Sequence, residues 1–358
     1  MSLIWADFPS GSPGLYGTTK ANMLNGLYAD VTSYTDLVDD PDPNITGNVF
    51  KFDSNIYGGG GAGASLRYAL PDGETVKIGV AGRYWLASLP SSADERPWPV
   101  RWHDGSNNEI ARIQITTTGA IEAYNNGSLA GTTGGPVLTS NAWTHLEAQL
   151  TCDTGGSGTL TVWVEGVQVI ALTGLTTTDA GTSQIAVSMD PSGTSSNPAM
   201  YVKDLVIWDG NGSQNNTQIG TCIVAELIPD ADVSTGWVST GANEYGVLDN
   251  VPANDAEYIE ADDSPPAASI VTLSDLPPDI VGVRGLVSIV RAWKTDGGDA
   301  TLQIGLSPNG SDYDNGADRA ITAAATFWRD VSELSPATAS AWTPIEVNAL
   351  RYRTNRTA

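Results

Sequence analysis

Residues 159–172 read TLTVWVEGVQVIAL, and this segment decides the fold class that the sequence predicts. From Leu160 to Val164 every second residue is apolar, which is the period of a strand with one face in a core. Glu165 and Gly166 then supply a two-residue turn in which the glycine accepts a positive φ, and the alternation resumes after them. The segment therefore predicts a β-hairpin with one buried face.

The same strand signals recur at short intervals along most of the chain. Runs of β-branched or alternating residues, bounded by Gly, Pro or Asp, predict strands at residues 48–53, 64–70, 76–86, 109–116, 201–208, 222–227, 269–273, 281–294, 301–306 and 320–328. Helix is scarce, although Thr343, Pro344 and Glu346 form the signature of a capping box and predict a short helix through Leu350. The predicted fold class is therefore all-β.

The length of 358 residues and the distribution of turn signals predict two domains. Residues 1–30 are nearly uncharged and rich in Gly, Ser and aromatic residues, which we interpret as an arm that lies on another surface. A first β domain is expected over residues 31–212 and a second over residues 213–358. A turn cluster at 209–212, followed by a polar segment, marks the expected junction.

The chain carries 17 Lys and Arg against 41 Asp and Glu, a formal net charge of -24. Such a charge repels nucleic-acid phosphates and anionic lipid head groups, which argues against nucleic acid and membrane as direct partners. The most apolar stretch, near 280–293, is interrupted by Arg284 and Arg291, so no transmembrane span is expected. No apolar stretch typical of a secretion signal is visible around Lys20, and synthesis in a host cytoplasm is therefore expected.

The two cysteines and two histidines do not form a pattern typical of a metal or redox site. Cys152 and Cys222 lie far apart, which favours two free thiols in strands and leaves one disulfide between them open. His103 and His145 are the two histidines, and His145 has no Cys or Asp at ligand spacing. We interpret His145 as a residue on a strand face.

Three segments of the first domain together resemble the laminin-G/concanavalin-A-like superfamily of lectins and glucanases. They are WTHLEAQL at 143–150, GTLTVWVEGVQV at 158–169 and MYVKDLVIWDG at 200–210, in the order usual for that superfamily. The resemblance covers roughly residues 30–210 and implies a jelly-roll sandwich of two sheets.

Five later segments resemble the C-terminal module of tailed-phage virion structural proteins, a module that commonly follows a lectin-like domain. They are WDGNGSQNNTQIG at 208–220, DNVPANDAEYIEAD at 249–262, LSDLP at 273–277, GSDYDNGAD at 310–318 and AWTPIEVNAL at 341–350. The resemblance implies a second, smaller β-sandwich and a place on a phage particle. It leaves head, tail tip and fibre open.

Glucanases of the lectin-like fold carry a Glu-x-Asp-x-x-Glu strand that places a nucleophile and an acid on one face, and this string does not occur in the chain. The nearest acidic cluster, residues 257–263, lies in the second domain. No serine-nucleophile elbow or phosphate-binding loop is visible either. The sequence therefore predicts that the protein is not an enzyme, with a carbohydrate-active depolymerase of the same superfamily as the alternative.

Two acidic loops raise the question of calcium. Asp209 and Asn211, and separately Asp312, Asp314 and Asp318, place oxygen ligands on glycine-bent loops, which is the chemistry that Ca²⁺ prefers. Solvated turns closed by Asx hydrogen bonds explain the same residues, and we favour that interpretation. No other cofactor is expected.

Glycan binding is the sharper hypothesis, because the chain has 11 Trp and 12 Tyr but only 4 Phe. Sugars stack on indole and phenol rings. Trp163 projects away from the apolar face of its strand, and Trp98 and Trp102 lie in a segment, residues 96–102, that we expect to line a rim. Packing under loops or at subunit contacts is the alternative for all three.

Together these observations predict a structural or adhesive protein on the surface of a tailed-phage particle, in a tail fibre that binds a receptor or in capsid decoration. The expected partners are other virion proteins, further copies of the chain in a homo-oligomer, with a trimer favoured, and a host surface glycan. Arg351, Arg353 and Arg356 form a basic tail that is either a docking element for an acidic neighbour or an ordinary frayed terminus.

Overall fold

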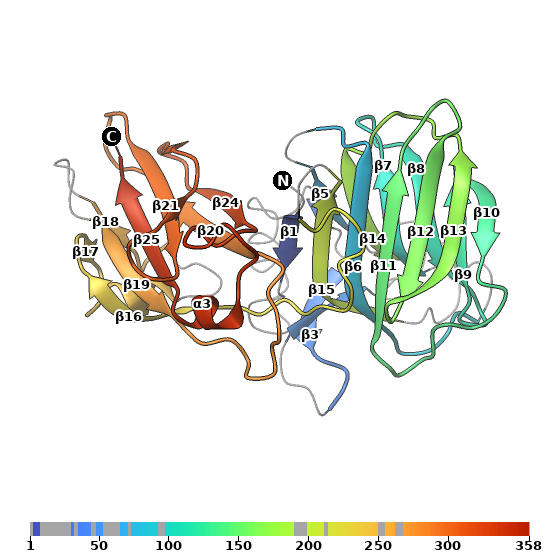
Figure 1. Cartoon of the computed structure of the whole chain (residues 1–358), viewed down its shortest axis with the longest axis horizontal. Helices are drawn as coiled ribbons and strands as arrows, with labels where there is room; N and C mark the ends of the chain where they lie inside the picture. Colours follow the sequence, from blue (N-terminus) through green and yellow to red (C-terminus); the bar gives the residue numbers. More distant parts are fainter. Residues whose placement is uncertain are drawn as a thin grey trace. The chain divides into compact units, whose positions relative to one another are not determined.

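The computed structural model describes residues 3–7, 30–31, 35–43, 48–52, 65–70, 73–91, 97–189, 199–210, 214–249, 255–261 and 268–357. The chain divides into two compact units, residues 1–224 and 225–358. The regular secondary structure of both units consists almost entirely of antiparallel strands, which confirms the predicted all-β class (Figure 1). Among the described residues, no helix has the length and apolar character needed to cross a bilayer.

The first unit contains an eight-stranded sheet. Seven strands follow one another across it in the order β13 (Val167–Leu175), β12 (Gly158–Val164), β11 (Thr144–Thr151), β6 (Lys77–Leu86), β15 (Met200–Asp209), β4 (Asn48–Phe52) and β3 (Thr35–Asp39), and β1 (Leu3–Asp7) also pairs with β15. Strands that are neighbours in sequence pair at both ends of this order, and strands far apart in sequence pair in its middle.

A seven-stranded sheet completes the first unit. Its strands follow the order β10 (Ser128–Thr132), β9 (Ile121–Asn125), β8 (Glu109–Ile115), β7 (Pro97–His103), β14 (Gln184–Met189), β5 (Ser65–Ala69) and β2 (Asp30–Val31). Apolar side chains from both sheets form one buried cluster, so the two sheets pack face to face around a single core. The sandwich expected for this part of the chain is therefore confirmed.

The β12–β13 hairpin has the geometry that its sequence predicts. Leu160, Val162 and Val164 are buried in the core, whereas the residues between them are half-buried on the opposite face. Both turn residues take positive φ, 49° at Glu165 and 77° at Gly166. This is the two-residue turn whose twist matches that of the flanking strands.

The second unit is built around a six-stranded sheet. Its strands are β16 (Pro229–Ser234), β19 (Ser269–Leu273), β25 (Arg351–Arg356), β21 (Thr301–Ser307) and β22 (Asp314–Asn315) in this order, with β23 (Arg319–Ala320) also paired to β21. Two further two-stranded sheets join β17 (Val238–Ser239) to β18 (Ile259–Glu260), and β20 (Leu286–Ala292) to β24 (Thr326–Ser332). A buried cluster of Leu306, Trp342, Val347 and Leu350 forms a core of this unit.

Two short helices accompany these strands, α2 (Tyr245–Leu248) and α3 (Pro344–Asn348). The start of α3 is the one that the sequence predicts. The Thr343 side chain accepts a hydrogen bond from the Glu346 backbone N–H, and the Glu346 carboxylate accepts one from the Thr343 backbone N–H. This reciprocal pair satisfies two backbone donors that the first helical turn would otherwise leave without partners.

The C-terminal arginines are not on a tail. Strand β25 lies inside the six-stranded sheet, between β19 and β21, with Thr354 buried. Arg351 and Arg353 alternate with Tyr352 along this strand, so they belong to its opposite face. The reading of this segment as a frayed terminus is corrected by its pairing on both sides, whereas its docking to an acidic neighbour stays a prediction.

Candidate functional site

Trp98 and Trp102 lie on the same strand, β7, and not in a loop. Four residues apart, they would share a face of a regular strand. A bulge against β14 prevents this, because Trp98 pairs with Ser188 and Arg101 with Ala186, so two residues of β7 face one residue of β14. As a result Trp102 is 0% exposed in the core, whereas Trp98 is half-buried on the outer face of the seven-stranded sheet. The rim position expected for Trp102 is corrected.

Trp98 belongs to a cluster of basic and aromatic side chains. The Arg101 guanidinium lies 4.4 Å and the Arg112 guanidinium 5.8 Å from the centre of the Trp98 ring, and Arg112 also lies 4.0 Å from the ring centre of Tyr124. Glu109 holds both arginines, with Arg101 Nε donating to Oε2 at 2.8 Å and Arg112 Nη1 donating to Oε1. The cluster is therefore ordered by charge-assisted hydrogen bonds and cation–π contacts.

Burial and mutual charge shift the ionisable groups of this cluster. Burial lowers the pKa of Arg101, and the positive charges of Arg67 and Arg112 add to this while Glu109 opposes it. Burial, helped by the charge of Arg101, lowers the pKa of His103 to about 4, so this imidazole is neutral at pH 7. Burial raises the pKa of Glu109, but the two guanidinium groups outweigh it and the net direction is downward.

Trp163 lies where the sequence places it, half-buried on the outer face of the eight-stranded sheet. It pairs with Glu147 on β11 and with Gln168 on β13. The side chain of Glu147 is fully buried, and it accepts hydrogen bonds from the backbone N–H groups of Ile219 and Gly220 at 2.7 and 3.1 Å. The segment that follows the last strand of this unit therefore passes over this part of the face.

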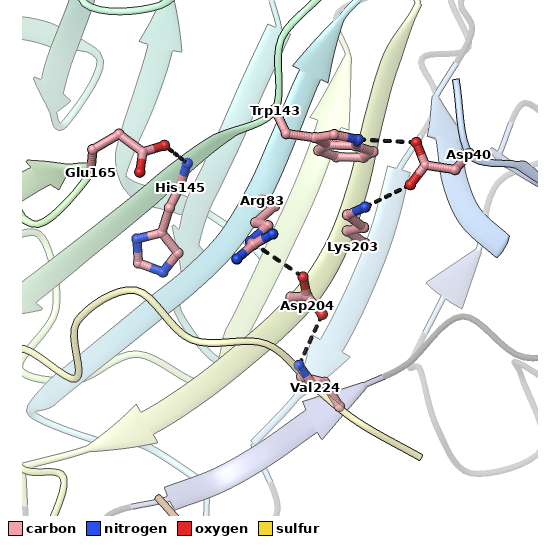
Figure 2. Close-up of polar contacts among 8 residues, drawn as sticks. All are labelled: Asp40, Arg83, Trp143, His145, Glu165, Lys203, Asp204 and Val224. Atoms are coloured by element: carbon pink, nitrogen blue, oxygen red, sulfur yellow. Dashed lines mark hydrogen bonds and ion pairs between the residues drawn. The ribbon is translucent and has the colours of Figure 1, made fainter. Parts of the chain in front are cut away.

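A second polar cluster lies further along the same outer face. His145 on β11, Arg83 on β6 and Lys203 on β15 are direct neighbours across three adjacent strands. Arg83 Nε lies 3.5 Å from Asp204 Oδ2, and the Arg83 side chain is 30% exposed. Figure 2 shows Arg83 between His145 and Asp204, with the imidazole on the same side of the sheet.

Lys203 forms its ion pair with Asp40, an acidic residue of a neighbouring segment, and not with the His145–Arg83–Asp204 cluster. Lys203 Nζ lies 2.6 Å from Asp40 Oδ2, Trp143 Nε1 donates to Asp40 Oδ1 at 3.0 Å, and Lys203 lies 4.2 Å from the centre of the Trp143 ring (Figure 2). The Asp40 carboxylate is almost fully buried and its charge is balanced by Lys203. These three residues therefore form a closed structural contact.

Asp204 and His145 carry the unusual features of the second cluster. Asp204 has a φ of 54° at a bulge between β15 and β6, a conformation that costs a non-glycine residue free energy. Burial raises the pKa of its carboxyl, against the lowering effects of the Val224 N–H and Arg83. His145 is 2% exposed, burial lowers its pKa, and neither ring nitrogen has a hydrogen-bond partner among the described residues.

Asp209, a calcium candidate of the first unit, is not on an open loop. Asp209 is the buried last residue of β15, and it pairs with Ile78 across the sheet. Asn211 lies outside the described residues. Within the part of the chain that the structure describes, no three His, Cys, Asp or Glu side chains are placed to hold a metal ion.

The calcium candidates of the second unit have separate partners. Asp312 closes a turn, donating its backbone N–H to the Asn309 side chain at 2.9 Å and accepting from the Asn309 amide nitrogen at 2.7 Å. Asp314 lies in β22, and Asp318 accepts hydrogen bonds from Gln303 and Thr357, both at 3.2 Å. The Asx-turn interpretation is therefore observed at Asp312.

The guanidinium group of Arg353 also contacts this stretch of the second unit. The Arg353 guanidinium lies 4.0 Å from the ring centre of Tyr313, and it donates to the Asn315 side chain. Cys152 and Cys222 are not joined by a disulfide. The described residues thus give neither a metal cluster nor a disulfide.

Sequence reasoning missed the arginines around Trp98 and the strained Asp204. The alternation of β8 gives a usable signal for Arg112, because Ile113 and Ala111 beside it are core residues. No sequence signal marks the β7 bulge, which depends on pairing with β14, a strand more than eighty positions later in the printed sequence. The site was therefore predictable by residue type and not by arrangement.

Comparisons with known proteins give a likeness in fold only. No family model and no curated protein matches the chain. Among solved structures, an endo-β-1,4-glucuronan lyase from the fungus Trichoderma reesei matches at 12% identity over 52% of this chain and 93% of its own, with a TM-score of 0.39. The PL-14 alginate lyase from Aplysia kurodai matches at 12% identity over 58% of this chain and 100% of its own, with a TM-score of 0.43. The alginate lyase vAL-1 from Chlorella virus matches at 13% identity over 56% and 99%, with a TM-score of 0.40.

These matches overturn one expectation from the sequence, that the protein is not an enzyme. Several of the matched structures are polysaccharide lyases. The missing Glu-x-Asp-x-x-Glu string speaks only against a glucanase that uses that pair of carboxylates. It does not decide against catalysis of another kind.

Proposed function

We propose that the first unit is a carbohydrate-active module that binds sugar on the outer face of the seven-stranded sheet, around Trp98. The observation that carries this proposal is the half-buried Trp98 indole, flanked by the guanidinium groups of Arg101 and Arg112. A sugar ring offers C–H groups to an aromatic face and hydroxyl groups to fixed donors and acceptors. Trp98 with Arg112, Tyr124 and Glu109 supplies both kinds of contact on one surface.

The other two candidate tryptophans fit this role less well. Trp102 is fully buried in the core, where no ligand reaches it without unfolding. Trp163 neighbours Glu147, the carboxylate that holds the segment at Ile219 and Gly220, so its surroundings serve the attachment of that segment. Trp98 has no such segment fastened over it among the described residues.

A glycan array tests this proposal with a matched pair of variants. Wild-type protein is expected to bind a subset of glycans, Trp98→Ala to lose that binding, and Trp163→Ala to retain it. Both variants remove one half-buried indole from an outer sheet face, so circular dichroism is expected to show the same folded state for both. Binding that survives in Trp98→Ala and disappears in Trp163→Ala would contradict the proposal.

A second candidate function is acid–base chemistry on a carbohydrate at the His145–Arg83–Asp204 cluster. The observation that favours it is the neutral imidazole of His145 beside Arg83, whose ring nitrogens have no hydrogen-bond partner among the described residues, together with the raised pKa of the Asp204 carboxyl. A neutral imidazole accepts a proton, and a guanidinium stabilises a developing negative charge.

An assay for release of reducing ends from host and algal polysaccharides tests this second function. The wild type is expected to release reducing ends from at least one polymer. His145→Ala and Arg83→Gln are expected to abolish this turnover, and Trp163→Phe is expected to keep it. No release from any polymer, or equal release by His145→Ala, contradicts the candidate.

For the whole chain we further propose a place on the surface of a tailed-phage particle, in a fibre or as a capsid decoration, after synthesis in the host cytoplasm. The support is the set of segments in the second half that resemble phage virion proteins, such as GSDYDNGAD at 310–318. The partners proposed are other virion proteins and two further copies of the chain. Immunogold labelling of purified particles and light scattering of the free protein test this, and unlabelled particles or a monomer would contradict it.

A further inference from the structure

Three arginines stand in one row across the seven-stranded sheet. Arg67 on β5 pairs with Ala186 on β14, Ala186 pairs with Arg101 on β7, and Arg101 pairs with Arg112 on β8. The next partner in the row is Tyr124 on β9. Since adjacent strands lie about 4.8 Å apart, the row from Arg67 to Arg112 extends over about 14 Å.

The row lies on the outer face of the sheet, and its middle position is the short side chain of Ala186. The residues beside Arg67 on its strand, Leu66 and Tyr68, are buried in the core, so Arg67 belongs to the opposite face. Ala186 separates Arg67 from Arg101 with a single methyl group. Long side chains therefore flank a short one on this face.

Several donors of this face lack an acceptor. The Nε atoms of Arg67 and Arg112 and the Nε1 atom of Trp98 are buried and have no hydrogen-bond partner among the described residues. A buried donor without an acceptor costs free energy, so a native protein that keeps three of them in one place needs a reason. Arginine and tryptophan side chains donate and do not accept, so a ligand that binds this face must supply the acceptors.

The three arginines of the row differ in their side-chain partners. Glu109 is shared by Arg101 and Arg112, and Glu122 accepts a hydrogen bond from the hydroxyl of Tyr124. Arg67 is held by the neutral side-chain oxygen of Asn107 and has no carboxylate partner among the described residues. Three guanidinium groups thus share this face with Glu109 and Glu122, and the row continues beyond Arg67 to its register partner Asp30 on β2, in a protein whose net charge is -24.

We infer that the row of Arg67, Arg101 and Arg112 beside Trp98 is a site for an anionic polysaccharide, with successive carboxylate-bearing sugars along the row. The inference rests on the proposed function and adds the chemical class of the ligand. The planar guanidinium group matches a carboxylate in a two-bond fork, and Arg67 is the group with such a fork to offer. A uronate polymer fits better than nucleic acid, because the strongly negative protein repels the denser charge of a duplex, one phosphate per about 1.7 Å.

The test compares acidic polymers with their own neutral forms. Oligosaccharides of alginate, polygalacturonate and hyaluronate, and the same oligosaccharides after chemical reduction of their carboxyl groups, are titrated into the full-length protein by calorimetry. The inference predicts that at least one acid form binds at least tenfold more tightly than its reduced form, and that added salt weakens this binding. A single-stranded oligonucleotide is expected not to bind.

Variants assign the effect to the row. Arg67→Gln is expected to weaken binding of the acid form about tenfold, the loss of one charge-assisted hydrogen-bond pair. Arg67→Lys is expected to retain part of the wild-type affinity for the acid form. Lys294→Gln, which removes a charge in the second unit, is expected to leave that affinity unchanged. Circular dichroism checks that each variant is folded.

The possible outcomes distinguish a failure of this inference from a failure of the proposed function. A reduced form that binds as tightly as its acid form, an unchanged affinity in Arg67→Gln, or equal binding of the oligonucleotide overturns the inference and leaves the proposed function standing. No binding of any of the six oligosaccharide preparations, together with an empty glycan array, overturns both.

Discussion

The carboxylate of Glu147, which is 0% exposed, accepts a hydrogen bond from the backbone N–H of Ile219 at 2.7 Å. Its other oxygen accepts one from Gly220 at 3.1 Å. Two further contacts fasten the same segment to the sandwich, Asn216 O to Lys77 Nζ at 2.8 Å and the Val224 N–H to Asp204 Oδ1 at 2.9 Å. The segment after β15 is therefore part of the first unit, beyond the domain boundary that the sequence suggested after residue 212.

Glu147→Gln is expected to lower the free energy of unfolding of the first unit by about 2–4 kcal/mol. An amide has one accepting oxygen, so its NH2 group would face one of the two backbone N–H groups. Glu165→Gln is the control, because that exposed carboxylate accepts from the single N–H of His145 and an amide oxygen replaces it, at about 0.5 kcal/mol or less. Urea denaturation followed by fluorescence measures both, and equal losses would contradict this role of Glu147.

Trp102→Ala and Trp163→Ala are expected to differ strongly in stability. Trp102 fills the core, so its loss leaves a cavity and lowers the free energy of unfolding by about 3–5 kcal/mol. Trp163 is half-buried, and its loss is expected to cost on the order of 1 kcal/mol. Thermal denaturation of the two variants side by side gives the comparison, and similar melting temperatures would contradict the placement of the two rings.

His103 is expected to make the protein less stable in mild acid. Its pKa is about 4 in the folded state, against about 6.5 when unfolded, so between these values only the unfolded state binds the proton. The free energy of unfolding is unaffected by this group above pH 6.5 and falls toward pH 4, with a slope approaching about 1.4 kcal/mol per pH unit. Urea titrations at several pH values are expected to show a shallower slope in His103→Gln. An NMR titration of His103 with a midpoint near 6.5 would refute the prediction.

Calcium is expected to leave the melting temperature unchanged. The stretch around Asp312 and Asp318 satisfies its carboxylates within the second unit, and the Arg353 guanidinium already lies against Tyr313 and Asn315. A cation bound there would be repelled by Arg353. Thermal shift in millimolar Ca²⁺, with Mg²⁺ as the control, checks this. The prediction would be contradicted if Ca²⁺ but not Mg²⁺ raised the melting temperature and if Asp312→Asn removed that increase.

Local sequence signals predicted most of the strands, because they act over a few residues. The alternation from Leu160 to Val164 and the Glu165-Gly166 turn give β12, the turn and β13, and the capping box gives α3. Arg351 and its neighbours read as a polar end of the chain, and only their pairing with β19 and β21 makes them a central strand. Long-range pairing is information that a local pattern does not carry.

The sequence predicts the residue types of the candidate site but not their arrangement in space. Tryptophan-rich composition pointed to carbohydrate, and Trp98 was among the residues selected. A bulge in one strand then decides that Trp98 faces outward while Trp102 fills the core, and cross-strand register decides that Arg67, Arg101 and Arg112 stand in line. Both depend on partners far away in sequence.

The central claim is that carbohydrate binds at Trp98, and NMR of the indole N–H groups tests it most directly. The 11 tryptophans give separate indole signals, of which those of Trp98 and Trp163 are assigned by replacing each residue with Phe. On titration with the glycan that binds best, the account predicts a large, saturable shift of the Trp98 signal and an unchanged Trp163 signal. A shift of Trp163 with a stationary Trp98 would contradict it.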